Sequence, residues 1–198
     1  MTNSRMMSSV VDLFSEPTSY TDAVLLVEGR KMHVNKANLS YYSDFFNTLF
    51  NSDFAEKSMP EIPIKDVEFE HFAFILGMIH REKPTFLLFV YHYNTEKLLE
   101  LADRFMMPHV THLVETYLLT NVFLTSSIFL ADKYRLEKLL KANINHLDNQ
   151  TDIEKVVMSP EYKTLRDETK VRVYEKSMIL KDIAPGVGKK SSKRARNE

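Results

Sequence analysis

The stretch Thr21–Phe50 reads TDAVLLVEGRKMHVNKANLSYYSDFFNTLF and decides the fold. Its first apolar run, Ala23–Val27, is continuous, which is typical of a strand buried on both faces. Glu28–Gly29 supplies a tight turn, because glycine adopts positive φ at little cost. Lys31–Val34 alternates polar and apolar residues, so we expect a return strand and therefore a β-hairpin.

Two short helices are predicted in the second half of the same stretch. Asn35 is a favourable N-cap, so we expect a helix to begin at Lys36. Ser43 is a second N-cap, and the apolar residues that follow it recur at helical spacing. These are Phe45, Phe46, Leu49 and Phe50.

Further elements follow in the order strand, then helices. Glu61–Lys65 alternates like a third strand, and Val67–His80 has a helical apolar stripe. Phe86–Tyr93 is apolar and aromatic, and we favour a short strand over a packed loop there. A helix is expected over Thr95–Phe105, and another begins at Pro108, where the missing N–H of proline costs little.

After Asn121 the sequence predicts only short helices. Leu101–Phe105 and Leu130–Tyr134 share one pattern (LADRF and LADKY), which predicts that a similar helix hairpin recurs. Residues 184–198 lack apolar content and are expected to be disordered. The sequence thus predicts an α+β domain over 20–120, an N-terminal segment 1–19 with a short helix, an all-α extension over 121–183 and a disordered basic tail.

The composition favours an intracellular protein with a real core. Apolar residues make up 44% of the chain, cysteine is absent and the net charge is −1. That charge hides an asymmetry, because residues 181–198 carry a net +4. The N-terminus has no long apolar run and no stretch reaches the ~18 apolar residues of a membrane span, so we expect a cytoplasmic or nuclear protein.

The sequence offers no support for a catalytic, cofactor or metal site. No Ser-His-Asp or paired-carboxylate arrangement has positional support. His109 and His112 are three residues apart on an expected helix, but no cysteine or paired carboxylate accompanies them. Met106–Met107 is predicted to be core or contact surface. We therefore expect neither an enzyme nor a cofactor-binding protein.

The order strand, strand, helix, helix, strand, helices resembles the BTB/POZ domain, a small three-stranded sheet flanked by helices. Five segments carry the resemblance in order: Tyr20–Val27, Gly29–Lys36, the helical residues Leu39, Ser43, Phe46 and Phe50, then Glu61–Val67 with Phe72, and Leu98–Phe105. The sequence of these segments is most similar to BTB domains that follow a MATH domain in nematodes, although only nineteen residues precede the BTB-like segment here. Asn35 replaces the histidine of many members.

The resemblance implies a protein-binding adaptor that dimerises, either with itself or with another BTB protein. Asp22 and Lys36 fall at positions where BTB dimers bury a charged pair, and such a pair can hold register while adding little stability. A short helix over Val10–Phe14, with Val10, Leu13 and Phe14 as apolar members, corresponds to the helix that forms dimers in the family. The alternative is that both charged side chains are solvated and that the helix packs on its own domain.

The resemblance also implies a contact with the third cullin, the scaffold of a class of ubiquitin ligases. Adaptors of the family present a hydrophobic-x-Glu element after the second core helix, where this chain has Phe54 and Glu56, followed by Ser58. An aromatic anchor would enter a pocket while the carboxylate fixes its orientation. The alternative is a Phe54 folded back on its own domain and a solvated Glu56.

The basic tail resembles a nuclear-import signal through Lys189, Lys190, Lys193, Arg194 and Arg196. The alternative is a solubilising end. Together these expectations describe a dimeric, substrate-recruiting subunit of a cullin-based ubiquitin ligase whose client is unknown. The competing hypothesis is a nuclear BTB regulator or scaffold that recruits corepressors. Membrane binding and specific nucleic-acid binding are not expected.

Overall fold

The computed structural model describes residues 10–52, 59–80, 94–120 and 126–183. The chain divides into two compact units, Met1–Asn121 and Val122–Glu198. The predicted strand at Phe86–Tyr93 lies outside the described residues. The predicted cullin-binding element at residues 54–58 and the predicted import signal in the basic tail also lie outside them. Each unit is described separately below.

The first unit contains a three-stranded mixed sheet of order β2-β1-β3. β1 (Ala23–Val27) pairs antiparallel with β2 (Arg30–Val34) and parallel with β3 (Ile62–Ile64). The two-residue turn at Glu28–Gly29 has positive φ at both positions, 49° and 74°. This is the backbone that a tight hairpin needs, so the hairpin prediction is confirmed.

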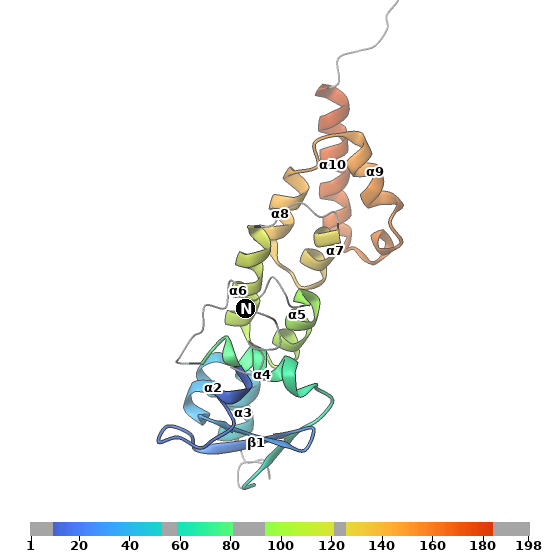
Figure 1. The fold of residues 1–198 in the computed structure, drawn as a ribbon. Coiled ribbons are helices and arrows are strands. Elements are labelled where there is room, and N and C mark those ends of the chain that lie inside the picture. The colour runs from blue at the N-terminus through green and yellow to red at the C-terminus, as the bar shows by residue number, and fades with distance from the viewer. Residues whose placement is uncertain (1–9, 53–58, 81–93, 121–125, 184–198) are drawn as a thin grey trace, which may run out of the picture. The chain divides into compact units, whose positions relative to one another are not determined.

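One face of this sheet is fully buried and the other is only partly covered. The buried side chains alternate along the strands: Leu25, Val27, Met32, Val34, Ile62 and Ile64. Between them, Val24 and Leu26 are half buried. The expectation that Ala23–Val27 is buried on both faces is therefore wrong, because the labelled helices of this unit lie on one side of β1 (Figure 1).

The helices of the first unit follow the predicted order. They are α2 (Lys36–Tyr42), α3 (Asp44–Asn51), α4 (Phe69–Gly77), α5 (Thr95–Arg104) and α6 (Pro108–Leu119). The side chain of Asn35 caps α2 through the N–H of Asn38, and Ser43 caps α3 through the N–H of Phe46. An aromatic cluster fills the centre, where Phe46 stacks on Phe105 with ring centroids 5.7 Å apart.

The second unit is helical throughout its described residues. It comprises α7 (Ser126–Lys133), α8 (Glu137–Asn145), α9 (Gln150–Met158), a 3-10 helix η4 (Pro160–Thr164) and α10 (Asp167–Ile183). Its interior is aliphatic, with side chains such as Ile128, Leu139, Leu140, Val156 and Val173 at 1% exposure or less. Among these short elements, only Pro160–Thr164 is a 3-10 helix in the described residues.

The predicted recurrence of a helix hairpin is confirmed in atomic detail. α5 is followed by Met106 at φ 49°, and α7 is followed by Arg135 at φ 55°. The N–H of Met107 donates to the carbonyl of Ala102 at 2.7 Å, and the N–H of Leu136 donates to the carbonyl of Ala131 at 2.8 Å. Both are Schellman C-caps, in which a left-handed residue closes the helix.

Candidate protein-interaction surface

The N-terminal segment is attached to the sheet of its own chain. Residues 10–12 form one helical turn, and Val10 and Phe14 are 4% and 3% exposed. The carbonyl of Phe14 accepts the N–H of His33 at 2.9 Å, and the Phe14 ring meets that of His80 edge-on at 5.5 Å. Two of the three apolar residues predicted for a dimer interface therefore support their own fold, while Leu13 is half buried.

Asp22 and Lys36 meet, but through the backbone of Lys36. Asp22 Oδ1 accepts the N–H of Lys36, the first residue of α2, at 2.7 Å. The Lys36 ammonium instead lies over the ring of Phe50, 5.7 Å from its centroid. Asp22 is exposed and Lys36 is half buried. A carboxylate at a helix N-terminus is favourable both as an acceptor and through the helix dipole.

The proposed cullin-binding residues Phe54, Glu56 and Ser58 lie outside the described residues, as do the tail residues Lys189 to Arg196. The structure does describe the two elements that flank the proposed cullin-binding residues, α3 before them and β3 after them. α3 ends at Asn51 and β3 begins at Ile62. The hydrophobic-x-Glu pattern therefore belongs to the connection between a core helix and the edge of the sheet.

The exposed apolar side chains of the first unit include Tyr41 and Met106, of which the sequence singled out only Met106. Tyr41 in α2 is 81% exposed and Met106 after α5 is 52% exposed. The two segments are joined where α3 begins, because the N–H of Asp44 donates to the carbonyl of Met106 at 3.3 Å and Ser43 Oγ donates to that of Phe105 at 2.5 Å. Met107 is buried, so the pair Met106–Met107 places one side chain on the surface and one in the core.

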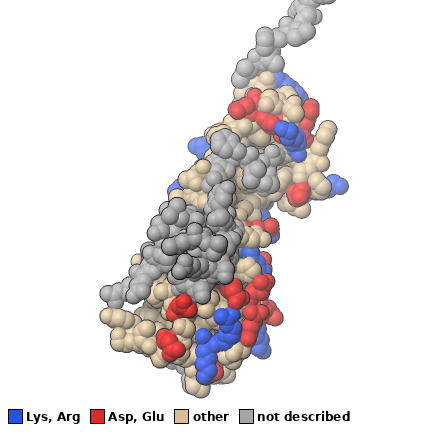
Figure 2. Space-filling view, viewed as in Figure 1, with Lys and Arg blue, Asp and Glu red and all other residues tan. Residues whose placement is uncertain are grey.

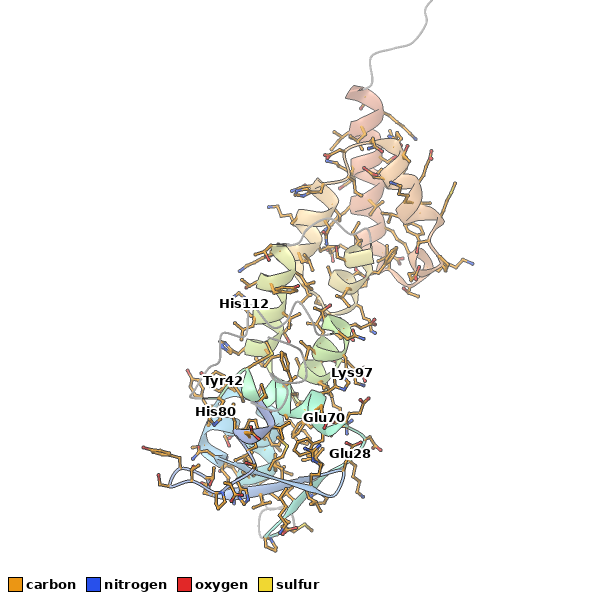
Figure 3. The ribbon with its side chains drawn as sticks, viewed as in Figure 1. Glu28, Tyr42, Glu70, His80, Lys97 and His112 are labelled. Atoms are coloured by element: carbon orange, nitrogen blue, oxygen red, sulfur yellow. The ribbon has the colours of Figure 1, made fainter. Side chains whose placement is uncertain are left out.

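Ion pairs reinforce the junction between the hairpin and α4. Glu28 Oε2 accepts the N–H of Phe69 at 2.9 Å and so caps α4 from a turn 41 residues earlier. Arg30 pairs with Glu70 at 2.6 Å and covers the Phe69 ring. The hydrogen bond from Arg30 holds the pKa of Glu70 below its usual value. Glu28 and Glu70 lie on the same side of this unit (Figure 3).

The charged surface near the hairpin is therefore mixed. Lys31 pairs with Glu61 at 2.5 Å, in addition to the Arg30–Glu70 pair. Figure 2 shows positive and negative side chains side by side over the first unit. Such neutralised surface does not favour a polyanion, whose binding needs unpaired positive charge. The visible face fits a protein partner better than a nucleic acid.

Two kinds of site find no support in the described part of the chain. No group of three or more His, Asp or Glu side chains there is arranged to hold a metal ion. His109 packs its ring against Tyr42, with centroids 5.1 Å apart. Among the same residues, no helix combines the length and the apolar character needed to cross a membrane.

The comparison with protein families matches residues 11–122 to the BTB/POZ domain. A BTB/POZ domain-containing protein of Caenorhabditis elegans is 37% identical over 173 residues, 85% of this chain and 52% of that protein. BTB and MATH domain-containing protein 36 of the same organism is 35% identical over 159 residues, 79% of this chain and 48% of that protein. The chain thus spans about half the length of these relatives.

Two more distant likenesses also contain BTB domains. Kelch repeat and BTB domain-containing protein 1 of cowpox virus is 22% identical over 191 residues, covering 93% of this chain and 33% of the viral protein. The solved BTB domain of human gigaxonin is 17% identical with a TM-score of 0.38, covering 56% of this chain and 85% of that structure.

Proposed function

This chain belongs to the BTB/POZ domain family, and we propose that it acts as a dimeric adaptor that recruits a client protein to a ubiquitin ligase built on the third cullin. BTB domains mediate protein–protein interaction, and proteins that contain them are generally non-enzymatic adaptors. The proposal has three parts, which are the contact with the cullin, the dimer contact and the site for the client.

The cullin contact is carried by Phe54-Ala55-Glu56, a hydrophobic-x-Glu pattern within the matched domain. It stands between α3 and β3, elements whose ends are fixed by the core at Phe50 and Ile62, 5% and 2% exposed. Exposed Tyr41 and Met106 provide further apolar surface on the same unit. Aromatic anchors with a neighbouring carboxylate are the residues expected to dominate such a contact.

The proposed dimer uses the face that carries Asp22, Lys36 and Leu13. Asp22 is exposed, and Lys36 and Leu13 are half buried, so all three retain surface to offer a second copy. Val10 and Phe14 would support this face from beneath, since both are buried in their own chain. In a dimer the Lys36 ammonium can leave Phe50 without breaking the α2 cap, because the cap uses only its backbone N–H.

A client site is proposed outside the first unit. The related proteins of C. elegans and cowpox virus carry MATH or Kelch in their names besides BTB. In the chain described here, the second unit is the candidate for a client site. Affinity purification of the tagged chain from cells should recover the third cullin together with a client. Recovery of the chain and its client without any cullin would contradict the ligase role.

The second candidate function is a nuclear regulator that recruits corepressors, favoured by the basic tail from Lys189 to Arg196. In this case a fluorescent fusion would concentrate in the nucleus and fractionate with chromatin. Replacing Lys193 and Arg194 with alanine should then move it to the cytoplasm. If the chain acts as a cullin adaptor with no function in the nucleus, the cellular distribution of the fusion should not change when Lys193 and Arg194 are replaced.

A further inference from the structure

The final helix α10 has one buried face and a separate face that carries exposed apolar side chains. One face packs within the second unit, where Thr169 and Val173 are 1% exposed and Ser177 is 8% exposed. Gln150 fixes this side by donating from Nε2 to the carbonyl of Ser177 at 2.8 Å. The packing of α10 beside α9 can be followed in Figure 1.

Another face of α10 carries a stripe of three large apolar side chains that remain exposed. Val171, Tyr174 and Met178 are 54%, 64% and 42% exposed. Their spacing of three and four residues is that of the a and d positions of a coiled-coil seam. Contiguous exposed apolar side chains on a helix mark an interaction site more often than scattered ones do.

The charges beside the stripe are separated by sign. With Val171 and Met178 at a and Tyr174 at d, the e positions are Glu168, Glu175 and Asp182, and the g position before Val171 is Lys170. In a parallel pair of helices the g residue of one copy faces the next e residue of the other. Lys170 would thus face Glu175 twice, once on each side of the pair. An antiparallel pair would instead place e beside e, acid against acid.

We propose that α10 is a self-association surface, on which the stripe Val171–Tyr174–Met178 pairs in parallel with that of a second copy of this chain. Three side chains make a short seam, so the contact is weak alone and adds to other contacts between the same two chains. This inference concerns the second unit, and its test compares positions on α10, so its failure is distinguishable from failure of the proposed contact at Asp22 and Lys36.

The absence of cysteine in the sequence permits a direct test by single-cysteine crosslinking of the full chain. Parallel pairing brings the same position of two copies together, within the ~4.4–6.8 Å between Cα atoms that a disulfide spans. Tyr174→Cys and Met178→Cys should each form a covalent dimer under mild oxidation. Ile179→Cys is the control, because Ile179 is 53% exposed on the same helix but lies beside the seam.

The expected result is a severalfold higher yield of covalent dimer for Tyr174→Cys and Met178→Cys than for Ile179→Cys. Within the Tyr174→Cys background, Glu175→Lys should lower the yield and the added change Lys170→Glu should restore it. Equal yields at all three positions would overturn the proposal. So would crosslinking only when the Tyr174→Cys and Met178→Cys chains are mixed, which indicates antiparallel pairing. Protein that stays monomeric, as expected if the tail or another protein covers the stripe, would overturn it too.

Discussion

Asp22 Oδ1 accepts a hydrogen bond of 2.7 Å from the backbone N–H of Lys36, so two residues that resemble the charged dimer pair of the family first meet within one chain. Asn35 strengthens the same junction, since it accepts the N–H of Asn38 at 2.7 Å and donates to the carbonyl of Tyr20 at 2.5 Å. Two of the free N–H groups at the start of α2 are satisfied in this way.

The first prediction concerns the stability that Asp22 gives to the fold. Asp22→Ala removes the acceptor for the N–H of Lys36, so the free energy of unfolding should fall by about 1 kcal/mol. Asp22→Asn keeps an acceptor oxygen and should recover most of that loss. Urea unfolding of the three proteins measures the difference. Equal losses for both variants would show that charge, and not the cap, is what matters.

The second prediction separates the cap from the proposed dimer contact. Lys36→Gln removes the ammonium but leaves the backbone N–H that Asp22 binds, so stability should change by less than about 0.5 kcal/mol. If the charged pair holds two chains in register, Lys36→Gln and Asp22→Asn should both weaken the dimer in sedimentation equilibrium. A dimer unaffected by either change would confine Asp22 to its role as a helix cap.

The third prediction concerns the buried carboxylate of Asp132, which is 4% exposed. It accepts the N–H of Arg166 at 3.0 Å and the hydroxyl of Thr169 at 2.5 Å, and it pairs with the Arg166 guanidinium at 3.0 Å. Burial alone would raise the pKa of Asp132, but the bonds from Thr169 and Arg166 hold that pKa below its usual value.

Because the folded-state pKa of Asp132 is the lower one, its stabilisation is complete above the ordinary aspartate value of ~3.9 and is lost as the pH falls through the folded-state pKa. Asp132→Asn should lower the free energy of unfolding by about 2 kcal/mol at pH 7 and by less near pH ~3. Asp103, its exposed counterpart in the repeated pattern, is the control. A loss from Asp103→Asn as large as that from Asp132→Asn would contradict this assignment.

The fourth prediction uses the two left-handed residues that follow α5 and α7. Met106 and Arg135 are both exposed, so replacing either with glycine removes little packing. Left-handed backbone costs a residue with a Cβ roughly 1 kcal/mol, which glycine avoids. Met106→Gly and Arg135→Gly should each raise the midpoint of thermal unfolding, while Met106→Ala should not. A gain from alanine equal to that from glycine would rule out backbone relief as the cause.

Local sequence signals predicted most of the fold correctly. The turn at Gly29 and the caps at Asn35 and Ser43 depend on residues that are close in the sequence. The hairpin and the two helix starts can therefore be predicted from the sequence alone. The resemblance to the BTB/POZ domain, drawn from five ordered segments, is confirmed over residues 11–122. The shared LADRF and LADKY patterns also indicated the recurring helix ends.

Contacts between distant segments could not be predicted in the same way. Glu28 caps α4 through Phe69, and the Arg104 guanidinium donates to the carbonyls of Lys65 and Asp66 at 2.7 and 2.6 Å. Nothing near these residues in the sequence specifies their partners. Asp103 and Asp132 hold the same place in the repeated pattern, yet only Asp132 is buried. The sequence pattern places the residue, and the packing around it decides its role.

The central claim is that this BTB protein docks on the third cullin through Phe54 and Glu56, and calorimetric titration of the purified full chain with the N-terminal domain of that cullin tests it most directly. The wild-type chain should bind, and Phe54→Ala with Glu56→Ala should weaken binding by at least about 30-fold, since an anchor contributes about 2 kcal/mol or more. Asp132→Asn should bind like the wild type at pH 7. No binding by the wild-type chain, or equal binding by the double variant, would contradict the account.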